Sequence, residues 1–278
     1  MLREVIRAQL YACGGEGLPE SLKVKGTDYS IEKVYKNDFF ASTALYRKRI
    51  VPECDAGKSL PERVILKMAR NTWCFCLPIH LFGKGLCSHE IRILKRLQGI
   101  SNVPRLLEEL GKYGFVYEYI EGCSLDEEPE KLPADFFARL SALLEEIHSR
   151  RVVYMDMNKR GNILLGSDGA PYIIDFQISL YLPHSNSIVS KIRASLCQDD
   201  IYHLRKHHRK FSVETMTPKE LAMSYRINAR VRIHRILTLP YKIIRRFVMK
   251  HLHKSGILVK EENTHYSPET DPERYANL

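Results

Sequence analysis

The chain has 278 residues, of which 44 % are hydrophobic, and it carries a formal net charge of +10. This length and apolar content allow a sizeable buried core and suit two lobes with one active-site cleft. The sequence contains no run of eighteen apolar residues, so we expect no membrane-spanning helix.

Residues 1–28 are predicted to be a poorly defined lead-in. Their apolar stretch is interrupted by Glu4 and Arg7, so it lacks the continuous core of a secretory signal peptide. The seven cysteines are odd in number and irregular in spacing, which is typical of reduced thiols in the cytosol. We therefore expect a cytoplasmic protein without structural disulfides.

A zinc site is the alternative interpretation of one group of cysteines. Neither the paired C-x-x-C spacing nor a second histidine is present, so buried thiols are favoured over metal ligands. The residues of this group are Cys74, Cys76, His80 and Cys87.

Residues 29–120 are predicted to form a mainly β lobe with one helix. Residues 34–41, with the sequence VYKNDFFA, read as a strand end and a turn, and a strand-like run follows them. Residues 63–68 form a second apolar run that places Lys67 near its end. Residues 88–97 have apolar side chains at helical spacing, with Ser88 as a possible cap, and this helix carries Glu90.

The first lobe ends in a strand, residues 115–119, which runs through Ile120 into a bend that Gly122 permits. Residues 121–255 are predicted to form a second, mainly helical lobe. Its first clear helix covers residues 136–147, and His148 is expected to cap the end of that helix.

The stretch YMDMNKRGNILLGSDGAPYIIDF carries Asp156, Asn162 and Asp175 within twenty residues. An apolar run follows Asn162, another precedes Asp175, and the turn signal of residues 167–169 separates them, which predicts a β-hairpin. Each residue taken alone is an ordinary turn former. Phosphoryl transfer from ATP needs a carboxylate near the attacking hydroxyl and hard oxygen ligands for magnesium, and the ordered set favours that chemistry.

These motifs resemble the protein-kinase-like superfamily, and most of all its RIO-like lipopolysaccharide kinase family of bacterial envelope enzymes. Enzymes of that family have a D-x-x-K-x-x-N loop followed by I-D-F-Q, and this sequence resembles them at both motifs. Lys159 stands at the position of the lysine inside the loop. Tyr154 stands where ordinary protein kinases have histidine. The resemblance implies an α+β fold with two lobes, an antiparallel sheet lobe with one helix and a mainly helical lobe.

The resemblance also implies ATP and Mg²⁺ as cofactors and a role for each matched residue. Asp156 would orient and deprotonate the acceptor, Lys159 would neutralise charge on the γ-phosphate, and Asn162 and Asp175 would bind magnesium. For the nucleotide, Lys67 held by Glu90 would bind phosphates, and the main chain of Glu118 and Ile120 would contact adenine. Lys36 would lie in the turn that covers the phosphates, and this turn lacks the G-x-G-x-x-G pattern. Asp200, expected near a helix start, would brace the catalytic loop, although a simple cap is the alternative.

Positive charge is concentrated in residues 191–254, where sixteen Lys and Arg face four Asp and Glu. Within it, residues 228–254 form a basic amphipathic segment that could lie on an anionic membrane surface, which would make the protein peripheral on the inner membrane face. A helix packed on the lobe is the equal alternative, and sparse aromatic residues make nucleic acid a weaker one. The tail, residues 256–278, is expected to be loosely ordered.

Three functions follow from this pattern. The first is a kinase of a sugar hydroxyl on a lipopolysaccharide-type glycolipid, because the segment from Asp175 to Asp199 is short and lacks the A-P-E motif that accompanies peptide substrates. The second is a RIO-like Ser/Thr protein kinase, autophosphorylation included. The third is a catalytically inactive, membrane-associated scaffold, which the missing glycine-rich loop favours.

Overall fold

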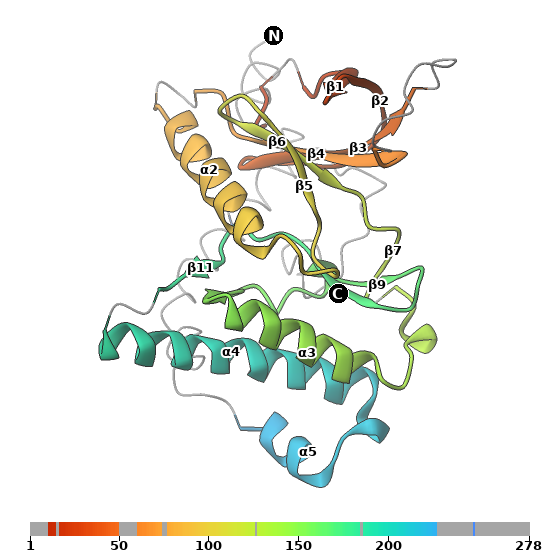
Figure 1. Cartoon of the computed structure of the whole chain (residues 1–278), viewed down its shortest axis with the longest axis vertical. Helices are drawn as coiled ribbons and strands as arrows, with labels where there is room; N and C mark the ends of the chain where they lie inside the picture. The colour runs from red at the N-terminus through yellow and green to blue at the C-terminus, as the bar shows by residue number, and fades with distance from the viewer. Residues whose placement is uncertain are drawn as a thin grey trace. The chain divides into compact units, whose positions relative to one another are not determined.

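A computed structural model describes residues 11–14, 17–49, 60–73, 77–125, 127–183, 186–226 and 247 of the chain. The chain divides into two compact units (Figure 1). The described residues up to Gln98, together with Pro104–Ile120, belong to the first unit, and Gly99–Val103 and the described residues from Glu121 onward belong to the second.

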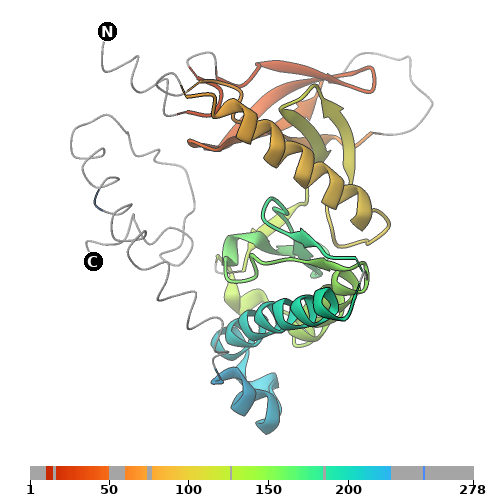
Figure 2. The ribbon, with the colours of Figure 1, turned by 90° about the vertical axis from the view of Figure 1, so that its left-hand side faces the viewer.

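The first unit contains an antiparallel sheet of six strands in the order β1-β2-β3-β4-β6-β5. The helix α2 (His80–Leu97) packs on this sheet (Figure 2). The strands are β1 (Ser21–Val24), β2 (Thr27–Asn37), β3 (Ala41–Lys48), β4 (Arg63–Ala69), β5 (Leu106–Leu110) and β6 (Gly114–Glu118).

The sheet begins earlier than the sequence suggested, because β1 lies within the expected lead-in of residues 1–28. Leu22 and Val24 alternate inward, and the strand pairs with β2 across a tight turn at Lys25 and Gly26, whose φ values are +45° and +90°. A glycine adopts such a φ without steric cost. A four-residue strand with one glycine turn gives too short an alternation to be recognised with confidence from sequence.

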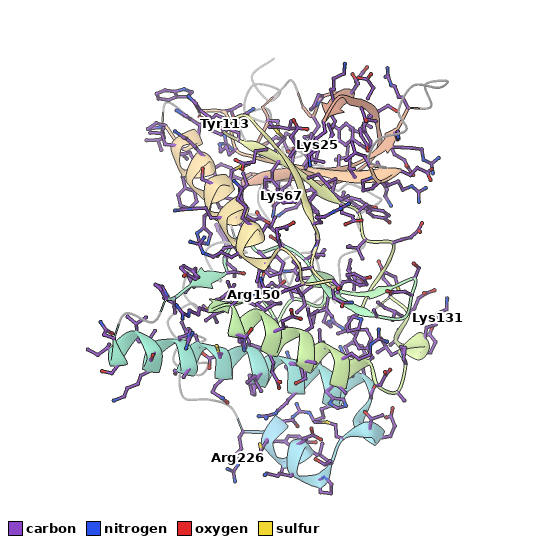
Figure 3. The ribbon with its side chains drawn as sticks, in the orientation of Figure 1. Lys25, Lys67, Tyr113, Lys131, Arg150 and Arg226 are labelled. Carbon is purple, nitrogen blue, oxygen red and sulfur yellow. The ribbon has the colours of Figure 1, made fainter. Side chains whose placement is uncertain are left out.

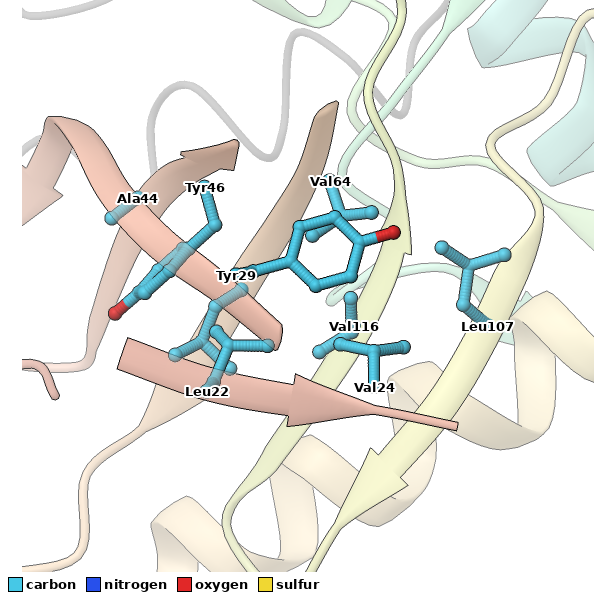
Figure 4. Packing of buried hydrophobic residues seen from close by; sticks show 9 residues of the cluster. Leu22, Val24, Tyr29, Ala44, Tyr46, Val64, Leu107 and Val116 are labelled. Atoms are coloured by element: carbon cyan, nitrogen blue, oxygen red, sulfur yellow. The ribbon is translucent and has the colours of Figure 1, made fainter. Parts of the chain in front are cut away.

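A core of nine buried residues lies on one face of the sheet (Figure 4). Two tyrosines reach out of it to satisfy their hydroxyls: Tyr29 donates to the carbonyl of Pro61 over 2.7 Å, and Tyr46 to that of Pro19 over 2.5 Å. The cluster consists of Leu22, Val24, Tyr29, Ala44, Tyr46, Val64, Leu66, Leu107 and Val116.

The other face of the sheet is covered by α2. Because side chains alternate along a strand, Leu66 points into the core and the next residue, Lys67, points toward α2. The helix begins at His80, eight residues before the expected start at Ser88. Gly83 and Gly85 lower the intrinsic helix propensity there, but packing of this turn against the end of β4 overrides it.

The second unit contains two small sheets and three α-helices within the described residues. The sheets pair β7 (Gly122–Ser124), β9 (Ile163–Gly166) and β10 (Pro171–Ile173) in the order β10-β9-β7, and β8 (Val152–Val153) with β11 (Leu180–Tyr181). The α-helices are α3 (Phe136–Ser149), α4 (Ser187–Phe211) and α5 (Pro218–Ser224), and the 3₁₀ turns are η1 (Pro129–Lys131), η2 (Arg160–Asn162) and η3 (Val213–Thr215).

The helix predicted over residues 136–147 is confirmed as α3, whose apolar stripe is buried. The predicted helix after Asp200 is present, but its predicted start is wrong, because α4 begins at Ser187. Asn186 caps it by accepting a hydrogen bond from the backbone amide of Val189 over 2.8 Å. Asp200 therefore lies in the middle of a long helix.

The α+β class expected from the sequence is confirmed in its coarse form, with an antiparallel sheet in the first unit and helices around small sheets in the second. The basic segment 228–254, apart from Phe247, and the tail 256–278 lie outside the described residues. Across the part of the chain that the structure describes, no helix combines the length and apolar content needed to cross a bilayer.

Candidate functional site

The predicted hairpin is confirmed and holds two of the expected magnesium ligands. β9 and β10 pair with Ile163 opposite Ile173, and the amide of Ile174 donates to the carbonyl of Asn162 over 3.0 Å. Asn162 thus stands across the ladder from the residue that precedes Asp175. The hairpin turn is closed by Asp168, whose carboxylate accepts from the amide of Ala170 over 2.9 Å.

Asp156, Lys159 and Asn162 converge on one carboxylate oxygen. Lys159 Nζ donates to Asp156 Oδ2 over 2.6 Å, and Asn162 Nδ2 donates to the same oxygen over 2.9 Å. Burial raises the pKa of Asp156, the ammonium of Lys159 opposes that shift, and the negative charge of Asp175 adds to it. The structure therefore brings four of the sequence-predicted site residues into one electrostatic group within the second unit.

One residue of this group and one residue beside it have strained backbone. Asp175 has a φ of +59°, and Met155, the residue before Asp156, has a φ of +70°. Non-glycine residues in this region cost about 1 kcal/mol or more and persist where the surroundings fix them. Phe176 supplies part of that constraint, because its buried ring meets the ring of Tyr154 edge to face at 5.2 Å.

Tyr154 links the loop that carries Asp156 to the strand end that precedes Asp175. Its hydroxyl donates to the carbonyl of Ile174 over 2.5 Å, and its own carbonyl accepts from the hydroxyl of Ser179 over 2.9 Å. Burial raises the pKa of Tyr154 well above its usual range, so the hydroxyl stays a donor. The residue that replaces histidine in the motif is thus a structural link between the two ends of the site.

Asp200 braces the loop that carries Asp156 from α4. Its two carboxylate oxygens accept from the backbone amides of Tyr154 and Met155, each over 2.9 Å. The bracing role predicted for Asp200 is confirmed, although it acts from mid-helix. The prediction that His148 caps α3 is wrong, because its ring lies 3.0 Å from Asp200 Oδ2.

The contact between His148 and Asp200 is an ion pair at neutral pH. Burial alone would lower the pKa of His148, but the hydrogen bonds with Asp200 and Cys197 raise it to about 9. A buried carboxylate that holds two amides and an imidazolium is fully engaged. The brace therefore includes α3 as well as α4.

Further contacts from α4 to the loop were missed by sequence reasoning. His207 donates from its ring to the carbonyl of Met157 over 2.9 Å, and Lys206 Nζ donates to Asn158 Oδ1 over 3.4 Å. Asp200 and His207 are seven residues, about two helical turns, apart. Both residues lie on the same buried face of the helix as Leu196 and Leu204, and this spacing in the sequence could have indicated that they are buried.

In the first unit, the expected ion pair between Lys67 and Glu90 is present. Lys67 is labelled in Figure 3. Its Nζ lies 2.8 Å from Glu90 Oε1, and both residues are buried, with exposed fractions of 7 % and 4 %. Removing two charges from water costs several kcal/mol per ion, so such a pair is weak evidence for stability. A lysine held rigidly in this way is suited to binding an anion.

The turn expected to cover phosphates is built without glycine. Asp38 Oδ1 accepts from the amides of Phe40 and Ala41, each over 2.9 Å, and the Asp38 carboxylate pairs with Lys36 at 2.9 Å. Hydrogen bonds from backbone amides to a side chain shape this turn. A glycine-rich loop depends instead on the conformational freedom of glycine. Lys36 lies beside the turn, bound to its aspartate.

A buried arginine that the sequence did not reveal anchors the same turn. The Arg70 guanidinium donates to the carbonyls of Phe39, Thr72 and Trp73 over 2.9, 3.2 and 3.3 Å, and it stacks on the Phe39 ring at 4.2 Å. The Arg70 amide also donates to the Phe40 carbonyl over 2.9 Å. Asp38 and Arg70 together fix the turn from both sides.

The expected adenine contacts lie at the end of β6. The Glu118 amide donates to the Arg105 carbonyl over 2.9 Å, and the Glu118 carboxylate lies 3.5 Å from Arg105 Nε. Any main-chain contact from Glu118 to a ligand would therefore use its carbonyl oxygen. Ile120 is the last residue of the first unit in this part of the chain.

The donor set of the second unit fits magnesium. Asn162 uses its amide nitrogen on Asp156, so its amide oxygen would be the ligand atom, and Asp175 would supply a carboxylate. Magnesium takes hard oxygen ligands and commonly binds one or two protein groups together with water and phosphate. Such a site is smaller than a cluster of three His, Cys, Asp or Glu residues, and the described residues contain no such cluster.

The zinc interpretation concerned Cys74 and Cys76, which lie outside the described residues. Cys87, from the same group, is a buried free thiol. Burial raises its pKa to about 12, and the charge of Glu90 adds to that shift. A thiol of this kind is an unreactive core residue.

No family model and no curated protein matches the chain. The function is therefore argued from the geometry of its residues and from chemistry.

Proposed function

We propose that the chain is an ATP- and Mg²⁺-dependent phosphotransferase whose acceptor is a sugar hydroxyl of a lipopolysaccharide-type envelope glycolipid. One observation carries the proposal: Lys159 and Asn162 donate to the same oxygen of Asp156, on a loop that Asp200 braces. A buried carboxylate beside a cation and an amide, with a second carboxylate close by, is the arrangement that phosphoryl transfer needs. The Lys67–Glu90 pair adds support.

In the proposed reaction Asp156 acts on the acceptor. The hydroxyl oxygen bonds to the γ-phosphorus of ATP while the bond to the β,γ-bridging oxygen breaks, and the hydroxyl proton passes to Asp156. Burial raises the pKa of Asp156, which makes it a better base than an exposed aspartate. Lys159, whose side chain is 44 % exposed, is free to turn from Asp156 toward the transferred group and to stabilise its charge.

The remaining residues hold the nucleotide. Asn162 Oδ1 and the Asp175 carboxylate are the magnesium ligands, and bound magnesium would neutralise charge on the phosphate oxygens. Lys67, fixed by Glu90, binds the α- and β-phosphates. Adenine is held by main-chain groups of Glu118 and Ile120, and the turn that contains Lys36 covers the phosphates.

The acceptor class is supported by the segment that follows the metal-binding aspartate. Residues 176–198 contain no Asp or Glu, and their cations are Lys191 and Arg193. Met155, Ile178 and Leu180, beside the catalytic loop, are exposed apolar residues. Cationic and apolar groups together suit an acceptor that has both negative charge and acyl chains. The segment also lacks the A-P-E motif that accompanies peptide binding.

The proposal is tested by transfer of γ-labelled phosphate from ATP into an envelope extract that is then separated into glycolipid and protein. We expect label in the glycolipid with the wild type and with Asp168→Asn, a matched change in the hairpin turn, and none with Asp156→Asn. Label confined to protein would contradict the acceptor and favour a RIO-like protein kinase. No label, together with no thermal shift on adding ATP and magnesium, would favour an inactive kinase-fold scaffold.

Peripheral attachment through residues 228–254, with the chain on the cytoplasmic face of the inner membrane, belongs to the same proposal. Its test is release of the wild type from anionic vesicles by high salt and loss of binding in Arg245→Glu/Arg246→Glu. Binding that resists both changes would contradict a role for this segment.

A further inference from the structure

The start of α2 presents an unusual group of exposed apolar side chains. Four large residues, spaced closely along the chain, have exposed fractions between 57 % and 59 %. We call them the apolar tip: Trp73, Leu77, Leu81 and Phe82. Single exposed apolar residues are common, but a contiguous group marks a surface that meets another apolar phase.

The members of the tip lie at or just before the same helix turn. Leu81 and Phe82 belong to the first turn of α2, and Leu77 lies just before it. The Trp73 ring contacts the ring of His80, the first residue of the helix, with centroids 5.0 Å apart. This contact places Trp73 at the turn of α2 that carries Leu81 and Phe82.

The backbone beneath the tip is held firmly. Arg70 donates to the carbonyl of Trp73 over 3.3 Å. The first turns of α2 pack so closely on β4 that a Cβ on Gly83 would lie 2.1 Å from the Arg70 carbonyl oxygen. A rigid base under exposed apolar side chains is suited to insertion into a partner, because little ordering entropy remains to be lost.

The charges around the tip indicate the partner. No Asp, Glu, Lys or Arg occurs between Arg70 and Lys84, so the tip itself is uncharged. The sole acidic residue of α2 is Glu90, which is buried against Lys67. The exposed charges of the helix are all cations: Lys84, Arg92, Lys95 and Arg96, of which Lys95 pairs with Glu109.

We propose that the apolar tip docks the first unit on the surface of an anionic lipid bilayer. Trp73, Leu81 and Phe82 enter the boundary between headgroups and acyl chains, where tryptophan is favoured. Lys84 and Arg92 then lie toward the lipid phosphates. This surface is made of other residues than the segment 228–254, and the proposal does not depend on phosphotransfer.

The chain contains one tryptophan, and it lies in the tip, so its fluorescence reports on the proposed contact directly. The test uses the full-length protein with vesicles of phosphatidylcholine containing about one third phosphatidylglycerol. We expect the Trp73 emission to shift to shorter wavelength and to be quenched by lipids brominated near the headgroup end of the chain. Vesicles of pure phosphatidylcholine should bind more weakly.

Variants separate the tip from other surfaces. Leu81→Ser/Phe82→Ser should weaken vesicle binding about tenfold or more, because affinity scales with inserted apolar area. The matched control is Val213→Ser/Tyr225→Ser, which changes two exposed apolar residues of the second unit and should leave binding unchanged. Asp156→Asn should also bind like the wild type, so a failure of the proposed chemistry would not affect this result.

Three outcomes would overturn the proposal. Vesicle binding without a change in Trp73 emission would place the contact elsewhere, for example in residues 228–254. Absence of vesicle binding would exclude a bilayer as the partner. A blue shift that grows with protein concentration in the absence of lipid would identify a second copy of the chain as the partner of the tip.

Discussion

Lys159 and Asn162 donate to the same oxygen of Asp156, over 2.6 and 2.9 Å. The carboxylate is buried, and Lys159 is the nearest charge that favours its ionised form. The lysine therefore has two effects on the carboxylate: it favours the ionised form of Asp156, and it occupies the oxygen that would otherwise accept a proton. A change at Lys159 should alter the protonation of Asp156 as well as the stabilisation of phosphate charge.

Replacing Lys159 by Met should lower the rate and move the acid limb of its pH profile to higher pH. Burial already raises the pKa of Asp156, and removing the ammonium removes the main effect that opposes the rise. A base with a higher pKa is protonated at higher pH, so activity is lost earlier as pH falls. The measurement is the phosphorylation rate against pH. Lys206→Met, which loses a contact to Asn158 and leaves the hydrogen bonds of Asp156 in place, should keep the wild-type limb.

A lower rate with an unmoved acid limb in Lys159→Met would show that the lysine does not control the protonation of Asp156. Its role would then be confined to the phosphate.

Replacing Asp200 by Ala should destabilise the second unit by about 3 to 5 kcal/mol. The change leaves the amides of Tyr154 and Met155 without their acceptor and leaves the buried His148 without its counter-charge. The free energy of unfolding in denaturant measures the loss. Asp199→Ala is the neighbouring control, and a loss of similar size there would argue against a specific brace.

The pair of His148 and Asp200 should also give the protein a pH-dependent stability. The pKa of His148 is raised from 6.5 to about 9 in the folded chain, so the folded state binds this proton more tightly than the unfolded state. The stabilisation is fully present below pH 6.5 and is lost as pH rises through about 9, with a size of about 3 kcal/mol. Unfolding followed at several pH values should show this slope. In His148→Gln the slope should be absent between these pH values.

The hairpin of Asn162 and Asp175 could be predicted because its signals are local. Two apolar runs and one turn decide it, and the register follows from the turn. Lys67 and Glu90 could be paired only through the order of motifs along the chain, since nothing local relates residues 23 positions apart. The strand and the helix that carry this pair were each visible as a local pattern, but their contact was not.

The supports of the site could not be predicted in the same way. Arg70 follows a strand and reads as a surface charge, yet it is fully buried because three carbonyls accept from it. His148 stands where a helix cap is common, and its partner lies 52 residues away. Contacts of this kind depend on tertiary packing, which periodicity does not encode.

The two glycines of α2 should respond oppositely to alanine, which tests the packing under the apolar tip. A Cβ on Gly83 would lie 2.1 Å from the Arg70 carbonyl oxygen and 3.0 Å from its amide nitrogen, and backbone atoms cannot move aside cheaply. Gly83→Ala should therefore push the helix away from β4 and cost about 3 kcal/mol. Gly85 has open space at the same position, so Gly85→Ala should stabilise the helix by about 1 kcal/mol. Thermal unfolding of the two variants gives the comparison. Equal effects of both changes would mean that α2 does not rest on Arg70, and the tip would then lack the rigid base on which its docking depends.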